Sequence, residues 1–191
     1  IFMKKVIILT PLFNDWLSLE IILKKLNTFL IKTSKNIEIL IVDDCSTEKL
    51  KNQFETKGSI KNVRILRLNK NVGSQRAIYR GLKEIYKSNQ KATVVIMDSD
   101  GEDDINALKR MITLSRKNPN YIITGNRSSR SEGFIFMFLY KIHLFLTFIL
   151  TGKYLDFGNF SAFNSKNLKI MLKNKKLKIA FSAGLKKNVK N

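Results

Sequence analysis

The sequence predicts an α/β fold in which a mostly parallel sheet is flanked by helices on both faces. Short apolar runs rich in β-branched residues alternate with segments whose apolar residues recur every three to four positions, the period of an amphipathic helix. Parallel strands need crossover connections, which are usually helices, so this alternation favours parallel pairing. With 191 residues, 44% of them hydrophobic, the chain can form one domain with a substantial core.

The expected elements alternate along the chain, and polar residues mark several helix starts. Strands are expected at residues 6–9, 37–42, 63–68, 94–97 and 121–124, and helices at 17–33, 74–88 and 105–117. Asn14 or Asp15 is expected to cap the first of these helices, and Asp103 or Asp104 the third. Ser46–Thr47 offers a further helix cap after the second strand.

The helix expected at 74–88 carries small residues on one face. Ala77 and Gly81 are four positions apart, so they lie one above the other on a helix. Small side chains at such positions let the helix approach the sheet closely.

The second part of the chain is less regular. Residues 126–133 are polar with two arginines, either a loop that orders on binding phosphate or a solvated linker. As a helix, the apolar segment 134–150 would be ~25 Å long against a ~30 Å hydrocarbon core, so an interfacial helix or a buried core helix is expected. His143 within it is expected to be structural. A strand and turn are expected at 154–164. The tail from residue 166 is Lys-rich with little apolar periodicity, except for the stretch Phe181–Leu185.

The charge of the chain indicates polyanionic partners. Its formal net charge is +20, and nucleic acid, anionic lipid and phosphorylated substrates all fit such an excess. Cys45 is the only cysteine, which excludes an internal disulfide and a Cys/His zinc cluster and fits a reducing compartment. Cys45 itself is expected to be a small buried residue. Met3 resembles a natural start, and no signal for export is expected.

An acidic motif follows the strand expected at 94–97. Asp98 and Asp100 would lie at the carboxyl edge of the sheet, where open α/β sheets bind ligands. Around a turn at Gly101, two carboxylates so spaced can face one hard cation, which commonly shares its oxygen ligands with phosphates. The alternative is a solvated acidic turn in which Asp103 or Asp104 only caps the next helix.

Taken together, the motifs resemble those of nucleotide-sugar glycosyltransferases of family 2, which have the GT-A fold, a Rossmann-like sheet flanked by helices. The motifs are Pro11–Asp15, Val42–Ser46, Asn71–Ala77, Met97–Asp103 and Arg127–Gly133. Asp156–Phe160 is similar to an element of dolichol-phosphate mannose synthases and bacterial polyprenyl-phosphate glycosyltransferases. The resemblance covers nearly the whole chain.

The resemblance implies a binding site for a nucleotide-sugar. The residues at the family's nucleotide-binding positions are Pro11, Asn14, Asp15, Asp43, Asp44, Gly73 and Arg76. Asp44 would accept the N–H of the base, with Asp43 supporting it. Asp98 and Asp100 form the family's Asp-x-Asp motif, which contacts the ribose and the Mg²⁺ or Mn²⁺ ion on the diphosphate. The expected chemistry is sugar transfer with inversion at the anomeric carbon.

The general base stays open. A hydroxyl acceptor needs a carboxylate to take its proton, whereas a phosphate acceptor is already ionised near neutral pH. Glu102, Asp103 and Glu132 are the base candidates, and the resemblance implies that Asp100 acts in catalysis through the cation. Asn159 stands where some relatives carry Asp, which argues against a base there.

The acceptor side is expected to lie in the later residues. Residues 1–133 would form the nucleotide-sugar-binding core, and 134–191 the interface helix, strand and basic tail of the same domain. Arg127 and Arg130 would orient an acceptor phosphate or the donor diphosphate. A polyprenyl phosphate explains the arginines, the apolar segment and the charge together, and a cell-surface glycan is the other acceptor considered.

The same features suggest a cytoplasmic protein at the inner face of an anionic membrane, where each nearby Lys or Arg contributes ~1 kcal/mol of attraction. Whether the protein forms a homo-oligomer or binds a membrane partner stays open. Whether the chain is a truncated form of a longer protein also stays open. The alternatives are a nucleotidyltransferase, whose glycine- and basic-rich loop after the first strand is missing, and a non-catalytic basic module binding nucleic acid or membrane. A polyanion binder gives no reason for acid at three strand ends, so no specific nucleic acid is expected.

Overall fold

A six-stranded sheet forms the centre of the computed structural model, which describes residues 5–30, 36–50, 54, 58–126, 157–178 and 181. The strand order is β3-β2-β1-β4-β6-β5. The strands are β1 (Lys5–Leu12), β2 (Asn36–Asp43), β3 (Ile60–Arg67), β4 (Thr93–Ile96), β5 (Ile122–Asn126) and β6 (Phe157–Asn164). β1 to β4 pair in parallel, and β6 runs antiparallel between β4 and β5. The expected mostly parallel sheet is confirmed.

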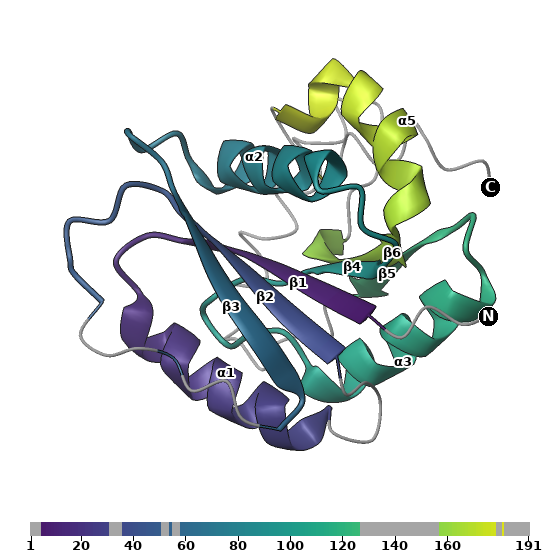
Figure 1. Ribbon diagram of the computed structural model, residues 1–191, viewed down its shortest axis with the longest axis horizontal. Coiled ribbons are helices and arrows are strands. Elements are labelled where there is room, and N and C mark those ends of the chain that lie inside the picture. Colours follow the sequence, from purple (N-terminus) through teal and green to yellow (C-terminus); the bar gives the residue numbers. More distant parts are fainter. Residues whose placement is uncertain are drawn as a thin grey trace, which may run out of the picture.

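Helices cover both faces of this sheet (Figure 1). α1 (Trp16–Phe29) and α3 (Ile105–Lys117) pack on one face, and α2 (Ser74–Lys87) and α5 (Leu168–Lys173) on the other. Because both faces are covered, β1, β2 and β4 are apolar at nearly every position rather than at alternate ones. In β2, for example, Ile39 lies in the core under α1, whereas Leu40 lies in the core under α2.

The five expected strands and the helices expected at 17–33, 74–88 and 105–117 are present, with some changes at their ends. α3 has the expected bounds, and the Asp104 side chain caps it by accepting the N–H of Asn106. β4 ends at Ile96, one residue early, and α1 ends at Phe29. The helix expected after Ser46–Thr47 is wrong for residues 44–50, which form no helix. Segment 134–150 with His143 lies outside the described residues.

The Lys-rich tail is more ordered than its sequence suggests. After β6 come a 3₁₀ turn (Ser165–Asn167), α5 and a second 3₁₀ turn (Lys175–Lys178). Four apolar residues scattered among the lysines are buried and join the core under α2; they are Leu168, Met171, Leu177 and Phe181. Ile170, by contrast, is exposed. The sequence beyond residue 166 has little apolar periodicity apart from the stretch at Phe181, yet a few anchors suffice to dock the segment.

Gly81 sets how closely α2 approaches the sheet. A Cβ atom added there would lie 2.3 Å from Cδ1 of Leu9 and 2.8 Å from Cγ2 of Val42. Both neighbours are fully buried and have little room to move. The small-residue face expected on this helix is thus used for close packing.

Glu38, a buried carboxylate of β2, links β2 to β1 and β3. Glu38 of β2 is 4% exposed and pairs with Nζ of Lys5 and Nε of Arg64, each at 2.7 Å. Burial raises the pKa of this carboxyl, but the hydrogen bonds and charges of Lys5 and Arg64 outweigh it, so the pKa of Glu38 lies below its ordinary value.

Replacing Glu38 by glutamine is expected to lower the free energy of unfolding by about 1–3 kcal/mol at pH 7, because the substitution removes charged hydrogen bonds. A carboxyl whose pKa falls on folding stabilises the fold above its ordinary pKa and loses that contribution as the pH drops through the folded value. The wild type should therefore lose stability below about pH 4.5, and E38Q should lose less. Urea unfolding between pH 7 and pH 3 measures both effects.

The matched control is E20Q, at an exposed pair with Lys24 on α1. It should change the free energy of unfolding by less than about 0.5 kcal/mol. Equal losses in E38Q and E20Q would contradict the assignment of stability to the buried carboxylate.

Candidate functional site

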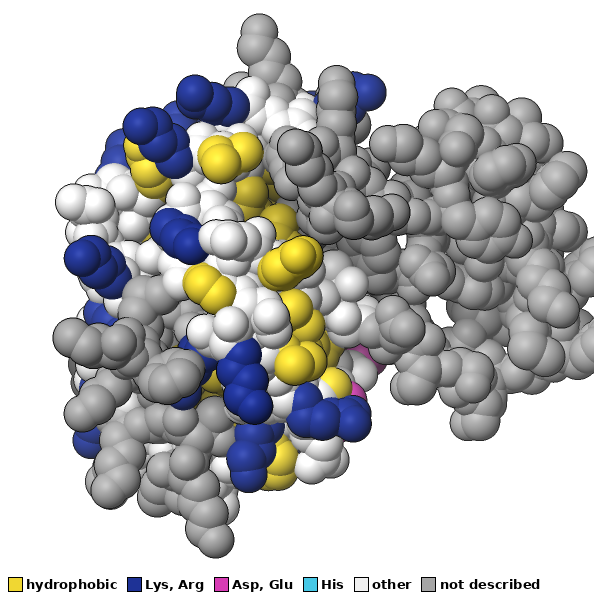
Figure 2. Space-filling view, turned by 90° about the vertical axis from the view of Figure 1, so that its right-hand side faces the viewer, with side chains coloured by type: hydrophobic (Ala, Val, Ile, Leu, Met, Phe, Trp, Pro, Cys, Tyr) yellow, Lys and Arg dark blue, Asp and Glu magenta, His cyan; other side chains and the backbone are white. Residues whose placement is uncertain are grey.

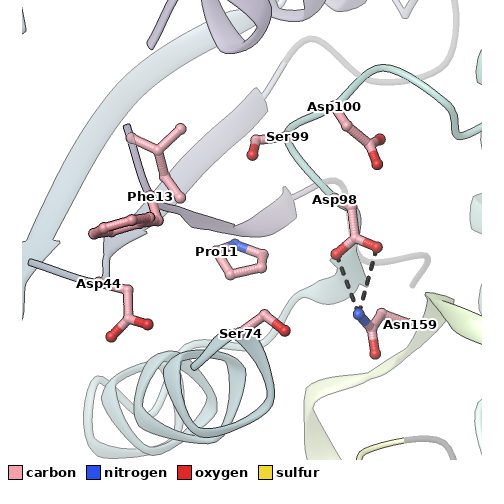
Figure 3. Close-up of a pocket in the computed structure, with 9 residues that line it drawn as sticks. Pro11, Phe13, Asp44, Ser74, Asp98, Ser99, Asp100 and Asn159 are labelled. Atoms are coloured by element: carbon pink, nitrogen blue, oxygen red, sulfur yellow. Dashed lines mark hydrogen bonds between the residues drawn. The ribbon is translucent and has the colours of Figure 1, made fainter. Parts of the chain in front are cut away.

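The carboxyl ends of β1, β2 and β4 meet the first residues of β6 at one edge of the sheet. β6 is antiparallel, and the pairing of Ile96 with Ser161 brings Asn159 beside the residues that follow β4. A pocket of about 240 Å³ opens at this edge (Figure 3). Its lining residues are Pro11, Leu12, Phe13, Asp44, Ser74, Asp98, Ser99, Asp100 and Asn159.

Asp44 joins the end of β2 to the start of α2. Its Oδ1 accepts the N–H of Val72 at 2.8 Å, and its Oδ2 accepts the N–H of Gly73 at 2.7 Å. Gly73 precedes α2 with a φ of 84°, a conformation that glycine adopts without strain. Each carboxylate oxygen keeps a second lone pair, so Asp44 can still accept a bond from a ligand in the pocket.

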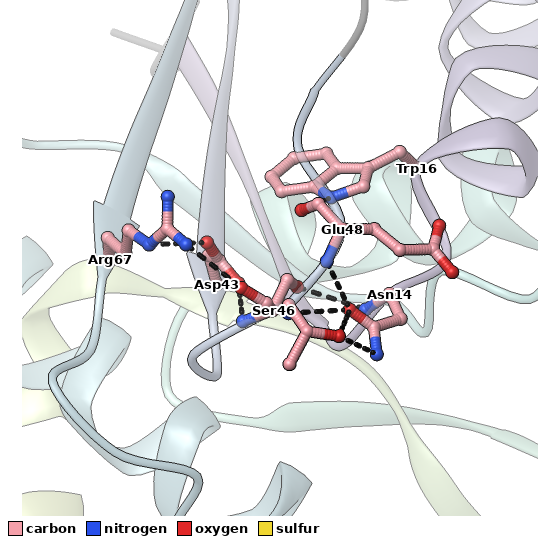
Figure 4. A network of polar contacts seen from close by, with 7 residues as sticks. Asn14, Trp16, Asp43, Ser46, Glu48 and Arg67 are labelled. Atoms are coloured by element: carbon pink, nitrogen blue, oxygen red, sulfur yellow. Dashed lines mark hydrogen bonds and ion pairs between the residues drawn. The ribbon is translucent and has the colours of Figure 1, made fainter.

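Asp43 and Arg67 hold the loop behind the pocket (Figure 4). Asp43 is 1% exposed, and its Oδ1 accepts the N–H of Ser46 at 2.8 Å. Its Oδ2 lies 3.4 Å from Nε of Arg67, which also donates from Nη2 to the carbonyl oxygen of Ser46. Asp43 thus holds the loop that follows Asp44 and does not line the pocket.

Asn14 fixes the same loop from the side of β1. Its Oδ1 accepts the N–H groups of Thr47 and Glu48 at 2.8 and 3.0 Å, and its own N–H donates to Oγ of Ser46 (Figure 4). Asp15 precedes α1, but its side chain makes no capping bond. The expected helix cap from these two residues is therefore wrong, and neither of them lines the pocket.

The acidic turn after β4 is ordered by its own backbone. Oδ2 of Asp103 accepts the N–H of Asp98 at 3.0 Å, and Oδ1 of Asp100 accepts the N–H of Glu102 at 2.9 Å. Gly101 has a φ of 79° at the bend. Nδ2 of Asn159 lies 3.2 and 3.4 Å from the two carboxylate oxygens of Asp98 (Figure 3).

A second cavity, of about 510 Å³, lies on the other side of this turn, against α3, β5 and β6. Asp98 and Asp100 line both cavities, and Glu102 and Asp103 line only the second. Arg110 of α3 is the one basic residue among the described residues that line it. Two chambers therefore meet at one pair of carboxylates.

Other expected site residues lie apart from the pocket lining. Gly73 contributes its N–H to Asp44, and Arg76 is exposed in the first turn of α2. Arg127, Arg130 and Glu132 lie outside the described residues.

Four pocket-lining residues were not expected. Leu12, Phe13, Ser74 and Ser99 each lie inside one of the motifs, between residues that were expected at the site. Their place within the motifs is the signal that could have identified them.

The donor set at the acidic turn fits a divalent cation that is shared with phosphate. Within the described ranges no group of three or more His, Cys, Asp or Glu side chains could hold a metal by itself. Mg²⁺ is usually bound by one or two carboxylates together with substrate phosphates and water, which matches the carboxylate pair Asp98 and Asp100. Pocket volume remains beside them for a ligand.

The surface over α3 and α5 combines basic and apolar side chains, and Figure 2 shows Lys and Arg side chains spread among hydrophobic ones on one face. The exposed basic residues of these helices are Lys109, Arg110, Lys117, Lys169 and Lys173. Leu114, Tyr121 and Ile170 are 45%, 55% and 62% exposed. None of the helices in the described parts of the chain is long and apolar enough to traverse a bilayer.

Comparison with known sequences gives one family and a curated relative. The model of the family described as "Glycosyl transferase family 2" matches residues 7–187. The dolichyl-phosphate beta-glucosyltransferase of Dictyostelium discoideum is 31% identical over 132 residues, covering 63% of this chain and 39% of the relative. The chain therefore spans well under half the length of this relative.

Solved structures share the fold. A mannosyltransferase from Pyrobaculum calidifontis in complex with GDP-Man and Mn²⁺ is 16% identical, with a TM-score of 0.59 over 89% of this chain and 47% of that one. S. aureus TarS is 16% identical, with a TM-score of 0.55, and the match covers 95% of this chain and 55% of TarS. A 4-diphosphocytidyl-2C-methyl-D-erythritol synthase is 11% identical, with a TM-score of 0.56, and the match covers 100% of this chain and 86% of the synthase. At such identities the likenesses show the fold alone, and they confirm the expected GT-A type.

Proposed function

Because the chain belongs to glycosyl transferase family 2, we propose that it transfers a sugar from a nucleotide-sugar donor to an acceptor at the edge where the two chambers meet. The observation that carries the proposal is the pair Asp98 and Asp100, which lines both chambers. A donor on one side and an acceptor on the other would meet at these carboxylates.

The donor is assigned to the pocket of about 240 Å³. Asp44 has lone pairs left for an N–H of the base, and Pro11 and Phe13 offer apolar surface beside it. The diphosphate would lie toward Asp98 and Asp100 at the other end. Asp43 and Asn14 contribute by fixing the loop, and Gly73 and Arg76 by forming the start of α2. Asp15 precedes α1 and is proposed to lie at the rim of the donor site.

The proposed cofactor is Mg²⁺ or Mn²⁺, held by Asp98 and Asp100 together with diphosphate oxygens. When bound, such a cation stabilises the negative charge that develops on the leaving nucleoside diphosphate. The chain's own part is to hold the two carboxylates in place, through the bonds from Glu102 and Asn159.

The acceptor is assigned to the chamber of about 510 Å³. Glu102 and Asp103 line it, and both are proposed as candidates to take a proton from a hydroxyl acceptor. An ionised phosphate acceptor would need no base. Arg127 and Arg130 are proposed to orient that phosphate.

A polyprenyl phosphate at an anionic membrane surface is the proposed acceptor. The name of the Dictyostelium relative indicates a lipid-phosphate substrate for that protein. This chain has a net charge of +20 and a face on which basic and apolar side chains mix, which suits attachment to the inner, cytoplasmic surface of a membrane. Residues 1–133 supply most of the lining of both chambers, and 134–191 add Asn159 to the first and Phe160 to the second. The part 134–191 is also proposed to provide the membrane-interface side of the same domain.

Calorimetry on the intact chain tests the donor site. UDP, GDP and their sugars are titrated with Mn²⁺ and with EDTA. One nucleotide should bind, and only with the cation. Incubation with that nucleotide-sugar and vesicles containing polyprenyl phosphate should then yield a glycosylated lipid by mass spectrometry.

If no nucleotide binds to the folded protein at any Mn²⁺ concentration, the donor site is wrong. Salt-sensitive binding to anionic vesicles or nucleic acid that ignores the nucleotide would favour the basic-module alternative.

A further inference from the structure

Gln75, a residue of α2 that does not line the pocket, is linked to the acidic turn by a chain of hydrogen bonds. Its Nε2 donates to Oδ1 of Asn159 at 2.9 Å, and Nδ2 of Asn159 faces the carboxylate of Asp98. At the other end, Oε1 of Gln75 accepts the backbone N–H of Phe181 at 2.6 Å. Four groups from distant parts of the sequence are thus connected in series.

The direction of this chain is fixed at both ends. A backbone N–H can only donate, so it determines that the oxygen of Gln75 faces Phe181 and that the nitrogen faces Asn159. An ionised carboxylate can only accept, so it requires the nitrogen of Asn159 to face Asp98. The two amide orientations agree with both requirements, so neither amide can reverse without losing a bond.

Phe181 provides a firm anchor for the chain of bonds. It is fully buried in the core under α2, beside Leu177. Its backbone N–H is therefore held in place by packing that does not depend on the site.

We infer that Gln75 is a positioning residue, which orients the Asp98 carboxylate through Asn159 and makes this orientation depend on the docking of Phe181. The inference rests on the proposed function for its effect on ligand binding, because Asp98 is there assigned to the cation and diphosphate. Partners behind metal-binding carboxylates commonly change metal affinity or activity 10- to 100-fold when they are mutated.

The decisive variant is Q75E, which has nearly the same shape. A glutamate can still accept the N–H of Phe181 but cannot donate to Asn159. In Q75E the Asn159 amide should then reverse, donate to the introduced carboxylate and turn its oxygen toward Asp98. Q75M, which removes both bonds without adding charge, separates the loss of the donor from the added charge.

The matched control is Q90E, which makes the same change of charge. Gln90 follows α2, and its Oε1 accepts from Nζ of Lys5, a bond that a glutamate can keep. Circular dichroism and urea unfolding establish that all variants are folded before they are compared.

Two measurements test the inference. In the ligand-free protein, the side-chain amide resonances of Asn159, identified by their loss in N159S, should shift in Q75E and Q75M but not in Q90E. Mn²⁺-dependent binding of the nucleotide that the wild type prefers should weaken about 10- to 100-fold in Q75E and Q75M, and change less than twofold in Q90E.

The outcomes separate the two proposals. If the wild type binds nucleotide and folded Q75E and Q75M bind it equally well, the positioning role is overturned and the donor site stands. If the wild type binds no nucleotide, the proposed donor site is wrong. The Asn159 resonances alone then test whether Gln75 orients Asn159. Unchanged resonances in Q75M overturn it.

Discussion

Replacing Asp100 by asparagine is expected to lower the rate of sugar transfer about 1,000-fold while leaving the fold intact. Asparagine keeps an oxygen that can accept the N–H of Glu102, so the turn around Gly101 is retained. It removes one of the two negative charges that line both chambers. A bound cation contributes several kcal/mol to charge stabilisation, and about 4 kcal/mol corresponds to a factor of 1,000 in rate.

Two measurements check this expectation. The free energy of unfolding of D100N should stay within about 0.5 kcal/mol of the wild type, as for an exposed position. Mn²⁺-dependent nucleotide affinity and transfer to polyprenyl phosphate in vesicles should both fall. E20Q on α1 makes the same change of charge at an exposed residue that lines neither chamber, and it should behave as wild type. A transfer rate within threefold of the wild type in D100N would contradict the role of this carboxylate.

Replacing Asp44 by asparagine is expected to affect stability and binding together. The buried carboxylate accepts two backbone N–H groups, and asparagine would turn an NH₂ group toward one of them. Hydrogen bonds to charged groups are worth about 1.5–3 kcal/mol each, so the free energy of unfolding should fall by about 2–3 kcal/mol. Because these bonds fix the start of α2 beside the pocket, nucleotide affinity should fall by at least about tenfold, as for other supporting contacts.

The control for Asp44 is the same substitution at Asp104. That carboxylate also accepts a backbone N–H, from Asn106, but it is exposed, and asparagine caps a helix as well as aspartate does. Urea unfolding of D104N should differ from wild type by a few tenths of a kcal/mol. Equal stability of D44N and wild type would show that the charge of Asp44 does not hold the loop.

The sequence was most informative where local chemistry decides the structure. The bounds of α3 were predicted from its apolar period and its acidic cap, both of which act within a few residues. β2 and β4 were predicted because buried parallel strands are continuous apolar runs. The acidic ends of β2 and β4 then predicted the edge at which Asp44, Asp98 and Asp100 line one pocket.

The sequence was least informative where the partner is distant. Asn14 can cap a helix in principle, but Thr47 and Glu48 offer it better bonds from the next loop. The docking of the tail was not predicted, because its buried apolar residues are spread among lysines. Only the apolar surface of α2, on which they pack, shows that they are buried. Gln75 has no local signal, since its partners lie 84 and 106 positions away.

The place of β6 also determines the order in which the molecule can fold. β1, β2, β3 and β4 can assemble from the first hundred residues, whereas β6 has to enter between β4 and β5 from much later in the chain. Until it does, β4 has an unpaired edge, and β5 has no neighbour among the described strands. Such distant pairing is slow to form, so refolding should show a late phase in which the edge of β4 is closed. Because Asn159 arrives with the same strand, the ability to bind ligand should appear only in that last phase.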